Sequence, residues 1–148
     1  MGKLLSLLVI TLNLFYTNGL VANKDVTPLC FMSSYIIHIK SNVNNLMLHC
    51  QSKDDDLGPV TRNAGEEFDI RFCINVWRTT LFYCHFNWQS KHQMFDVFAL
   101  KKKKVPEYCY ARSFGKLDCY WWVKDDGFYV PLSNEHTPNN WVKRYDWE

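Results

Sequence analysis

The chain has 148 residues, of which 16% are aromatic, and a formal net charge of +2 at pH 7. A charge this close to zero gives no reason to expect nucleic acid as a partner, because nucleic-acid binding depends on clustered positive charge. The length suits one domain that buries roughly two-thirds of its unfolded surface.

Residues 1–22 have the layout of a secretory signal peptide. A lysine precedes an apolar run over residues 4–12, and small or polar residues follow. The run is too short to span a bilayer comfortably, and Gly19 and Ala22 each offer a small residue before a cleavage point. We expect this segment to be removed and residues 23–148 to form one exported domain with no membrane insertion. The alternative is an uncleaved anchor.

Six cysteines lie beyond that segment. An even number of cysteines in an exported domain favours disulfides over free thiols. The sequence has no Asn-x-Ser/Thr acceptor, so N-glycosylation is not expected. The cysteines are Cys30, Cys50, Cys73, Cys84, Cys109 and Cys119.

Short runs in which apolar and polar residues alternate follow one another along the domain. A period of two is the signature of a β-strand with one buried face. Polar turn signals separate the runs, and Asp126-Gly127 lies between two of them as in a tight hairpin. No segment has a helical stripe, so we expect an all-β sandwich or barrel. The predicted strands are SYIIHIK (34–40), LMLHC (46–50), FDIRFCI (68–74), LFYCHFNW (81–88) and CYWWVK (119–124).

The stretch HCQSKDDDLG, residues 49–58, contains three consecutive aspartates. Calcium loops space their carboxylates at alternate positions, whereas consecutive aspartates point in different directions. A glycosidase needs two carboxyls across a cleft, and nothing places Glu66 or Glu67 opposite the aspartates. We therefore interpret the stretch as a strand end and an acidic turn, in which Leu57 re-enters the core and Gly58-Pro59 reverses the chain.

Two Cys-His neighbours, His49-Cys50 and Cys84-His85, raise the alternatives of a zinc site or a thiol nucleophile. Adjacent residues on a strand point to opposite faces, so neither pair can act as a joint ligand set. We found no ribonuclease motif among the histidines. They are interpreted as surface or half-buried residues: His38, His49, His85, His92 and His136.

A run of four lysines, Lys101 to Lys104, is the most strongly biased tract. It is able to bind an anionic wall polymer or lipid headgroups, but such a run is more often a solvated loop that protects a sheet edge. Tryptophans are able to stack on sugar rings, and alternation leaves only Trp77 and Trp122 available for that purpose.

Several blocks together resemble the plant self-incompatibility S-protein homologue family. They are HCQSKDDDLG, a Gly-Glu-Glu-Phe strand, NVWRTTLFYCHFNW, FDVF and CYWWVKDDGFY, from about Ile36 to Tyr129. Arg78 departs from the family's usual glycine and Ser41 from a common asparagine, which puts local loop shape in doubt. Cys30 and Cys73 are additions to the four family cysteines.

The resemblance implies a small secreted antiparallel β-sandwich, for which we expect about seven to eight strands stabilised by disulfides. The best-understood members act as stigma-side ligands that pollen recognises through a membrane receptor and a calcium response. We therefore expect a non-enzymatic signalling ligand with a plasma-membrane receptor as partner, monomeric, without cofactor, metal or catalytic residues. The alternatives are a wall-binding carbohydrate module of the same fold and a secreted hydrolase.

The disulfide connectivity does not follow from the sequence, since six cysteines allow fifteen pairings. Alternation places Cys50, Cys84 and Cys119 on apolar faces, where they are able to meet in a core. We favour Cys50–Cys119 and Cys84–Cys109, with Cys30–Cys73 as an optional third bridge.

Partner recognition is expected in loops, because the core is used by packing. We predict that the loops at residues 90–93, 101–104 and 111–116 carry it. The candidate contact residues are Lys91, His92, Lys101, Lys102, Lys103, Lys104, Arg112 and Lys116.

Overall fold

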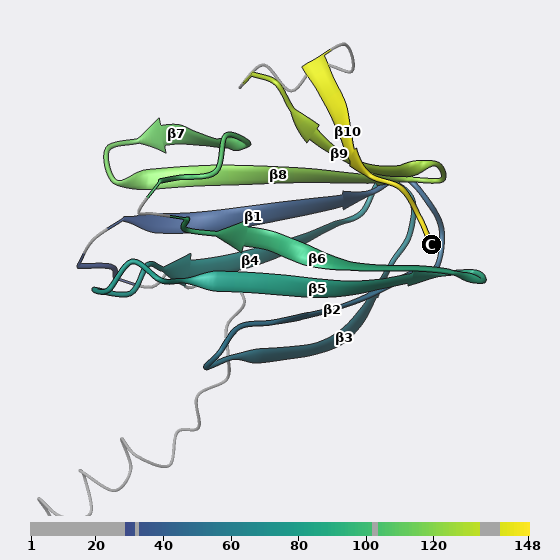
Figure 1. Cartoon of the computed structure of the whole chain (residues 1–148), viewed down its shortest axis with the longest axis horizontal. Coiled ribbons are helices and arrows are strands. Elements are labelled where there is room, and N and C mark those ends of the chain that lie inside the picture. Colours follow the sequence, from purple (N-terminus) through teal and green to yellow (C-terminus); the bar gives the residue numbers. More distant parts are fainter. Residues whose placement is uncertain (1–28, 32, 102–103, 134–139) are drawn as a thin grey trace, which may run out of the picture.

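The structure is a computed structural model that describes residues 29–31, 33–101, 104–133 and 140–148. The predicted signal peptide, Lys102, Lys103 and His136 lie outside the described residues. Within the described ranges, no helix has the length and apolarity to cross a membrane. Two β-sheets lie face to face (Figure 1). The predicted β-sandwich is thereby confirmed.

A six-stranded sheet, sheet A, has the order β10-β9-β8-β1-β4, and β7 also pairs with β8. A four-stranded sheet, sheet B, has the order β3-β2-β5-β6. The strands are β1 (Ser34–Ser41), β2 (Leu46–Gln51), β3 (Asp56–Arg62), β4 (Glu67–Cys73), β5 (Leu81–Trp88), β6 (Lys91–Ala99), β7 (Cys109–Ser113), β8 (Lys116–Lys124), β9 (Gly127–Pro131) and β10 (Trp141–Tyr145).

Two features differ from the expectation. The described residues form ten strands, more than the seven or eight expected, because β3, β7 and β10 are short or edge strands without clean alternation. The sandwich is also not purely antiparallel, since β1 pairs with β8 in parallel. The chain passes through sheet B between these two strands, and a crossover of that kind is what a parallel pair requires.

The space between the sheets is filled by the apolar faces predicted from alternation. On β1, Tyr35, Ile37 and Ile39 are buried. Aromatic rings dominate the rest, and Phe95 lies 4.7 Å from the Trp121 ring centroid. Such packing leaves the outward faces and the loops for function. The other inward residues include Leu46, Leu48, Ile70, Phe72, Phe82, Phe86, Val97, Phe98, Val123, Phe128 and Val130.

The favoured pairings Cys50–Cys119 and Cys84–Cys109 were wrong. The bridges are Cys50–Cys84 within sheet B and Cys109–Cys119 within sheet A, each with Cα atoms 4.0 Å apart. Cys50 lies directly opposite Cys84 in the β2–β5 register, and Cys109 opposite Cys119 in the β7–β8 register. Both bridges thus join direct cross-strand neighbours within one sheet, which the strand register brings together and which alternation alone does not reveal.

The third favoured bridge, Cys30–Cys73, is present, with Cα atoms 5.4 Å apart. It ties the segment before β1 to the end of β4. All six cysteines are therefore oxidised, and none is a free thiol.

The stretch 49–58 contains a turn, but the turn comes earlier than expected. The Ser52 N–H donates to the carbonyl of Asp55 at 2.8 Å, and the Ser52 hydroxyl accepts from the Asp55 N–H at 3.0 Å. Gly58-Pro59 lies inside β3 and does not reverse the chain, and Leu57 is 38% exposed and does not re-enter the core. β3 is an edge strand whose register with β2 shifts between His49 and Gln51, and Leu57 falls at this irregularity.

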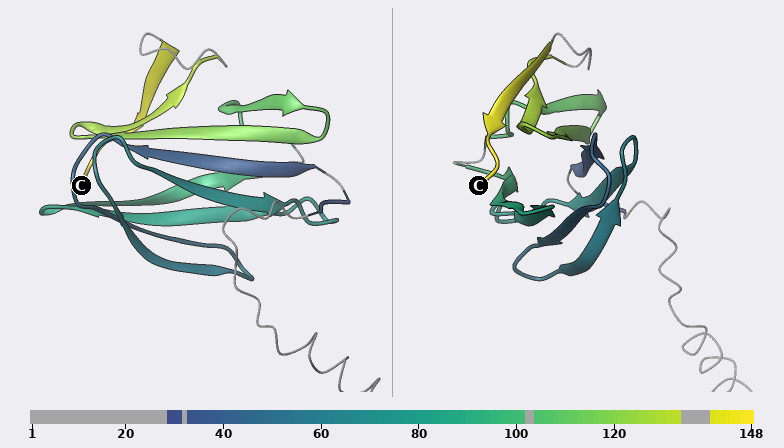
Figure 2. Two further views of the ribbon diagram at one scale, coloured as in Figure 1. Left: turned by 180° about the vertical axis from the view of Figure 1, so that it is seen from behind. Right: turned by 90° about the vertical axis from the view of Figure 1, so that its right-hand side faces the viewer.

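The C-terminal segment crosses from one sheet to the other. β10 pairs with β9 at the edge of sheet A, and the chain then reaches the start of β6 in sheet B (Figure 2). The Trp147 indole packs 4.5 Å from the Phe128 ring and donates to the carbonyl of Lys124 at 2.9 Å. The tail therefore closes one open side of the sandwich.

Candidate functional site

The predicted contact residues do not form one surface. Lys101 and Lys104 line a cleft at the end of β6, whereas Arg112 and Lys116 line a separate hollow beside the β7–β8 turn. Lys91 begins β6 at its other end. Lys102 and Lys103 lie outside the described residues.

The cleft beside Lys101 and Lys104 has a volume of about 540 Å³. Lys104 N–H donates to the carbonyl of Lys101 at 2.9 Å, which holds these two lysines next to each other beside the cleft. Tyr108, Trp121 and Tyr145 give the cleft an aromatic lining.

Two polar groups in the lining of the cleft already have a hydrogen-bond partner within the protein. Trp121 Nε1 donates to the carbonyl of Val97 at 2.9 Å, and the Tyr108 hydroxyl donates to the same carbonyl at 3.2 Å. Burial, with the nearby Tyr145 and Asp96, raises the pKa of Tyr108, so its hydroxyl stays neutral. Three aromatic residues and two lysines in one lining suit a ligand that has both an apolar face and a negative charge.

Arg144 and Glu107 also line the cleft and form an ion pair with each other. Their charges offset, and Asp96 adds a negative charge to the lining. The positive character of the cleft therefore depends on Lys101 and Lys104.

Arg112 and Lys116 flank a two-residue turn, and not the loop that was expected over 111–116. β7 ends at Ser113 and β8 begins at Lys116, which leaves only Phe114 and Gly115 between them. Phe114 is fully exposed at the tip. The Arg112 guanidinium lies 3.5 Å from the Asp118 carboxylate, so it is partly neutralised.

Lys91 and His92 belong to β6 and not to a loop at 90–93. The Lys91 ammonium donates to the carbonyl of Asp125 at 3.0 Å, and the backbone of His92 pairs with Glu148. The Lys91 ammonium is therefore partly occupied within the molecule, whereas the His92 side chain stays exposed.

The two tryptophans proposed for sugar stacking differ in access. Trp77 is 78% exposed in the β4–β5 loop. Trp122 is half-buried, with the Lys124 ammonium 4.0 Å above its ring and the Trp141 ring 5.2 Å away. Of this pair, Trp77 is the open ring.

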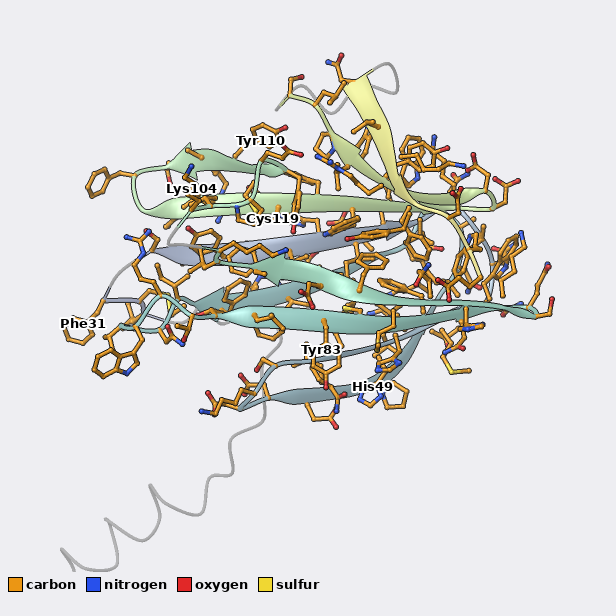
Figure 3. All side chains as sticks on the ribbon, viewed as in Figure 1. Phe31, His49, Tyr83, Lys104, Tyr110 and Cys119 are labelled. Atoms are coloured by element: carbon orange, nitrogen blue, oxygen red, sulfur yellow. A yellow bond between two sulfur atoms is a disulfide. The ribbon has the colours of Figure 1, made fainter. Side chains whose placement is uncertain are left out.

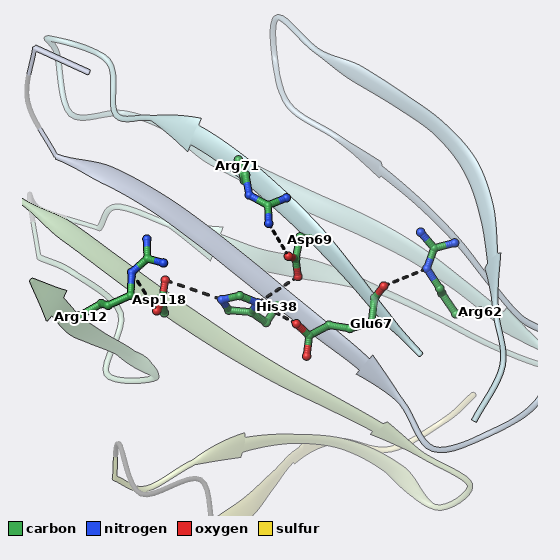
Figure 4. A network of polar contacts seen from close by, with 7 residues as sticks. All are labelled: His38, Arg62, Glu67, Asp69, Arg71, Arg112 and Asp118. Atoms are coloured by element: carbon green, nitrogen blue, oxygen red, sulfur yellow. Dashed lines mark hydrogen bonds and ion pairs between the residues drawn. The ribbon is translucent and has the colours of Figure 1, made fainter. Parts of the chain in front are cut away.

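A charged cluster around His38 was not anticipated from the sequence, which indicated only a half-buried histidine. His38 Nδ1 lies 2.9 Å from Glu67 Oε1 and 2.9 Å from Asp69 Oδ1, while Nε2 lies 3.6 Å from Asp118 Oδ1. Figure 4 shows these groups on the outer face of sheet A, drawn from β1, β4 and β8. The β1–β4 register, which places His38 opposite Asp69, brings them together.

The cluster changes the protonation of His38. Burial alone would lower the pKa of His38, but hydrogen bonds to Asp69 and Glu67 outweigh it and raise this pKa to about 9. The same histidine lowers the pKa of Asp69 against the opposing effect of burial. Within the described residues, His38, Glu67 and Asp69 are also the group that has ligand atoms close enough together to hold a metal ion.

The two Cys-His neighbours behave as strand geometry predicts. Cys50 and Cys84 are buried in their disulfide, and His49 and His85 point outward. His49 and Tyr83 lie on the outer side of sheet B (Figure 3). His49 Nε2 instead contacts Asp56 Oδ1 across β2 and β3.

The fold and disulfides define a small, cystine-stabilised β-sandwich, and sequence comparison identifies its family. The model of the family described as plant self-incompatibility protein S1 matches residues 36–147. The chain belongs to this family, which confirms the resemblance found in its sequence blocks.

Individual curated proteins that are similar to the chain support the same family. S-protein homolog 5 of Arabidopsis thaliana is 35% identical over 83 residues, which cover 55% of this chain and 57% of that protein. S-protein homolog 20 of the same plant is 30% identical over 109 residues, or 74% of this chain and 68% of the relative. Self-incompatibility protein S1 of Papaver rhoeas is 30% identical over 94 residues, which cover 64% of this chain and 63% of that protein.

The match to S-protein homolog 5 thus spans little more than half the length of that relative. No solved structure shows a significant match to the chain.

Proposed function

We propose that the protein is a secreted, non-enzymatic signalling ligand that a plasma-membrane receptor recognises, in self-incompatibility or a related form of cell–cell recognition. The observation that carries this proposal is the family match over residues 36–147. One relative is named as the self-incompatibility protein S1 of Papaver rhoeas.

The disulfides support export. All six cysteines are paired, as expected in an oxidising extracellular compartment. The pairing also removes the thiols that a cysteine nucleophile would need. A rigid sandwich that displays short loops is suited to recognition by shape and charge.

The test is the binding of oxidised, fluorescently labelled protein to intact plant cells before and after mild surface proteolysis. Saturable binding that proteolysis removes is expected for a receptor ligand. Lys104→Glu should weaken this binding several-fold if the cleft rim contacts the receptor, since about 1.4 kcal/mol corresponds to tenfold in affinity. Lys53→Glu is the matched control, because Lys53 is an exposed lysine in the β2–β3 turn.

A second candidate function is a wall-binding module for anionic polysaccharide, and the cleft is the observation that favours it. Lysines at the rim and tyrosine rings in the lining are the groups that bind acidic sugars. In that case binding would survive proteolysis, would fall with added salt, and would be inhibited by soluble polysaccharide.

A further inference from the structure

The His38 cluster lies outside the cleft that the receptor proposal uses. Its three nearest ligand atoms are His38 Nδ1, Glu67 Oε1 and Asp69 Oδ1, which all lie within 4.8 Å of one another. The side chains are 16%, 43% and 23% exposed, so the group is open to small solutes on one side. One imidazole and two carboxylates are ligands that divalent transition metals accept.

The carboxylates are oriented with one oxygen toward His38. Arg71 binds Asp69 Oδ2 at 2.9 Å, which leaves Oδ1 facing the imidazole (Figure 4). The Glu67 carboxylate has no arginine partner among the described contacts, and Arg62 instead donates to the Glu67 backbone carbonyl at 3.0 Å. Asp69 Oδ1 is therefore held toward the imidazole by Arg71, whereas Glu67 Oε1 is placed there by its own contact with His38 Nδ1.

Asp118 provides an independent observation. Its side chain is nine-tenths buried, and its Oδ1 accepts no hydrogen bond although it lies 3.6 Å from His38 Nε2. Arg112 lies near the other oxygen, Oδ2. The buried Oδ1 therefore faces the second ring nitrogen of His38 as an ion-pair partner and has no hydrogen bond of its own.

A metal-bound histidine usually donates its second ring N–H to a carboxylate, which fixes the ring and its tautomer. Asp118 stands where that carboxylate is needed, behind Nε2. The Tyr120 ring stacks on the imidazole with centroids 4.9 Å apart and an angle of 16° between planes, which limits rotation of the ring. The arrangement thus resembles a set of metal ligands in which neighbouring side chains, Asp118 and Tyr120, hold the histidine ligand in position.

We infer that His38, Glu67 and Asp69 bind a divalent transition-metal cation such as Zn²⁺, and that Asp118 orients the imidazole. The cation replaces the proton that Nδ1 shares with the two carboxylates. Zinc bonds to nitrogen and oxygen are about 2.0–2.2 Å, so the ligand atoms must separate by a few tenths of an ångström from their present 2.9 Å. Calcium is a poorer fit because it takes oxygen ligands only.

The sandwich offers a matched control on its other sheet. His49 also contacts a carboxylate, that of Asp56, but Asp56 is 58% exposed, and among the described residues no third metal ligand lies close enough to the pair. His49→Gln should therefore leave Zn²⁺ binding unchanged, whereas His38→Gln should abolish it.

The experiment is a calorimetric titration of the full, oxidised protein with ZnCl₂, with circular dichroism to check folding. The expected result is one Zn²⁺ per chain for the unaltered protein and for His49→Gln. Glu67→Gln, which changes an exposed side chain and should fold, removes a ligand and should weaken binding at least tenfold. Asp118→Asn should weaken it by about 10- to 100-fold with all three ligands intact.

Absence of saturable Zn²⁺ binding by the unaltered protein would overturn the inference. Equal binding by Glu67→Gln would do the same, as would an equal loss in His49→Gln. None of these outcomes bears on binding to cells, so the receptor proposal is tested separately.

Discussion

The backbones of His92 and Glu148 exchange two hydrogen bonds: the His92 N–H donates at 2.8 Å and the Glu148 N–H donates at 2.9 Å. His92 belongs to β6 in sheet B, and Glu148 follows β10 of sheet A. The C-terminal residue therefore connects the two sheets on the side where the sandwich would otherwise be open. Trp147, beside this pair, fills the space beneath it.

Trp147→Ala should destabilise the domain substantially. The indole packs on Phe128 and Trp88 and donates to the carbonyl of Lys124. Fully buried tryptophans cost about 3–5 kcal/mol when truncated to alanine, and Trp147 is only partly buried, so we expect about 2–3 kcal/mol. Urea unfolding monitored by circular dichroism measures this change.

Trp77→Ala is the matched control for Trp147→Ala. Trp77 is 78% exposed, so its removal should change the free energy of unfolding by less than about 0.5 kcal/mol. Equal effects of the two substitutions would show that the tail does not close the sandwich.

The bridges should contribute unequally to stability. In the chain-entropy model a disulfide that closes 43 residues, as Cys30–Cys73 does, contributes about 4 kcal/mol, and one that closes 10 residues, as Cys109–Cys119 does, contributes about 2.7 kcal/mol. We expect the double serine variant at Cys30 and Cys73 to lower the melting temperature more than the double serine variant at Cys109 and Cys119 does.

Peptide mapping by mass spectrometry without reduction checks the pairing itself. Fragments that join Cys50 to Cys84 and Cys109 to Cys119 are expected. A fragment that joins Cys50 to Cys119 would restore the pairing favoured from the sequence and contradict the strand register.

Alternation predicts which face of a strand is buried, but not which sheet the strand joins. This is why the apolar faces, such as that of Tyr35, Ile37 and Ile39, were predictable and the cysteine pairing was not. Cys50 and Cys119 both face the interior, yet they belong to different sheets. A period of two contains no information on strand order.

The His38 cluster could not be predicted from the sequence for a related reason. Glu67 and Asp69 share one face of β4, as their spacing of two residues indicates. Nothing in the sequence shows that β4 pairs with β1 in the register that places Asp69 opposite His38. Lys101 and Lys104 were easier to identify, because a lysine run is visible in the sequence, but the cleft beside them forms only when β6, β8 and β10 come together.

Asp56 should titrate at unusually low pH. Hydrogen bonds from His49, from the Gly58 N–H and from Gln51 lower the pKa of Asp56 to about 2. A lowered pKa means that these contacts stabilise the fold at pH values above the ordinary aspartate pKa, about 3.9, and that the stabilisation is lost as the pH falls through about 2. The NMR chemical shift of the Asp56 carboxyl carbon, recorded against pH, measures this pKa.

His49→Gln tests the cause of that shift, since His49 makes the largest contribution to it. The pKa of Asp56 should rise toward its ordinary value in this variant, and the low-pH transition should disappear in Asp56→Asn. An unchanged pKa in His49→Gln would mean that the Gly58 N–H and Gln51 lower the pKa of Asp56 without His49.

Gly127→Ala should detach β10 from β9. Gly127 has a φ of +147°, and an added Cβ would overlap the carbonyl oxygen of Tyr145 and approach the Lys143 side chain at 3.3 Å. Backbone cannot move aside as a side chain can, so we expect a loss beyond the roughly 1–2 kcal/mol that an alanine costs at a positive φ. Gly58→Ala is the control, because Gly58 has a φ of +68° and open space around it. Amide hydrogen exchange separates the two effects: Val142 and Lys143 in β10 should lose protection in Gly127→Ala and keep it in Gly58→Ala, and retained protection in both would show that β10 does not depend on this close approach.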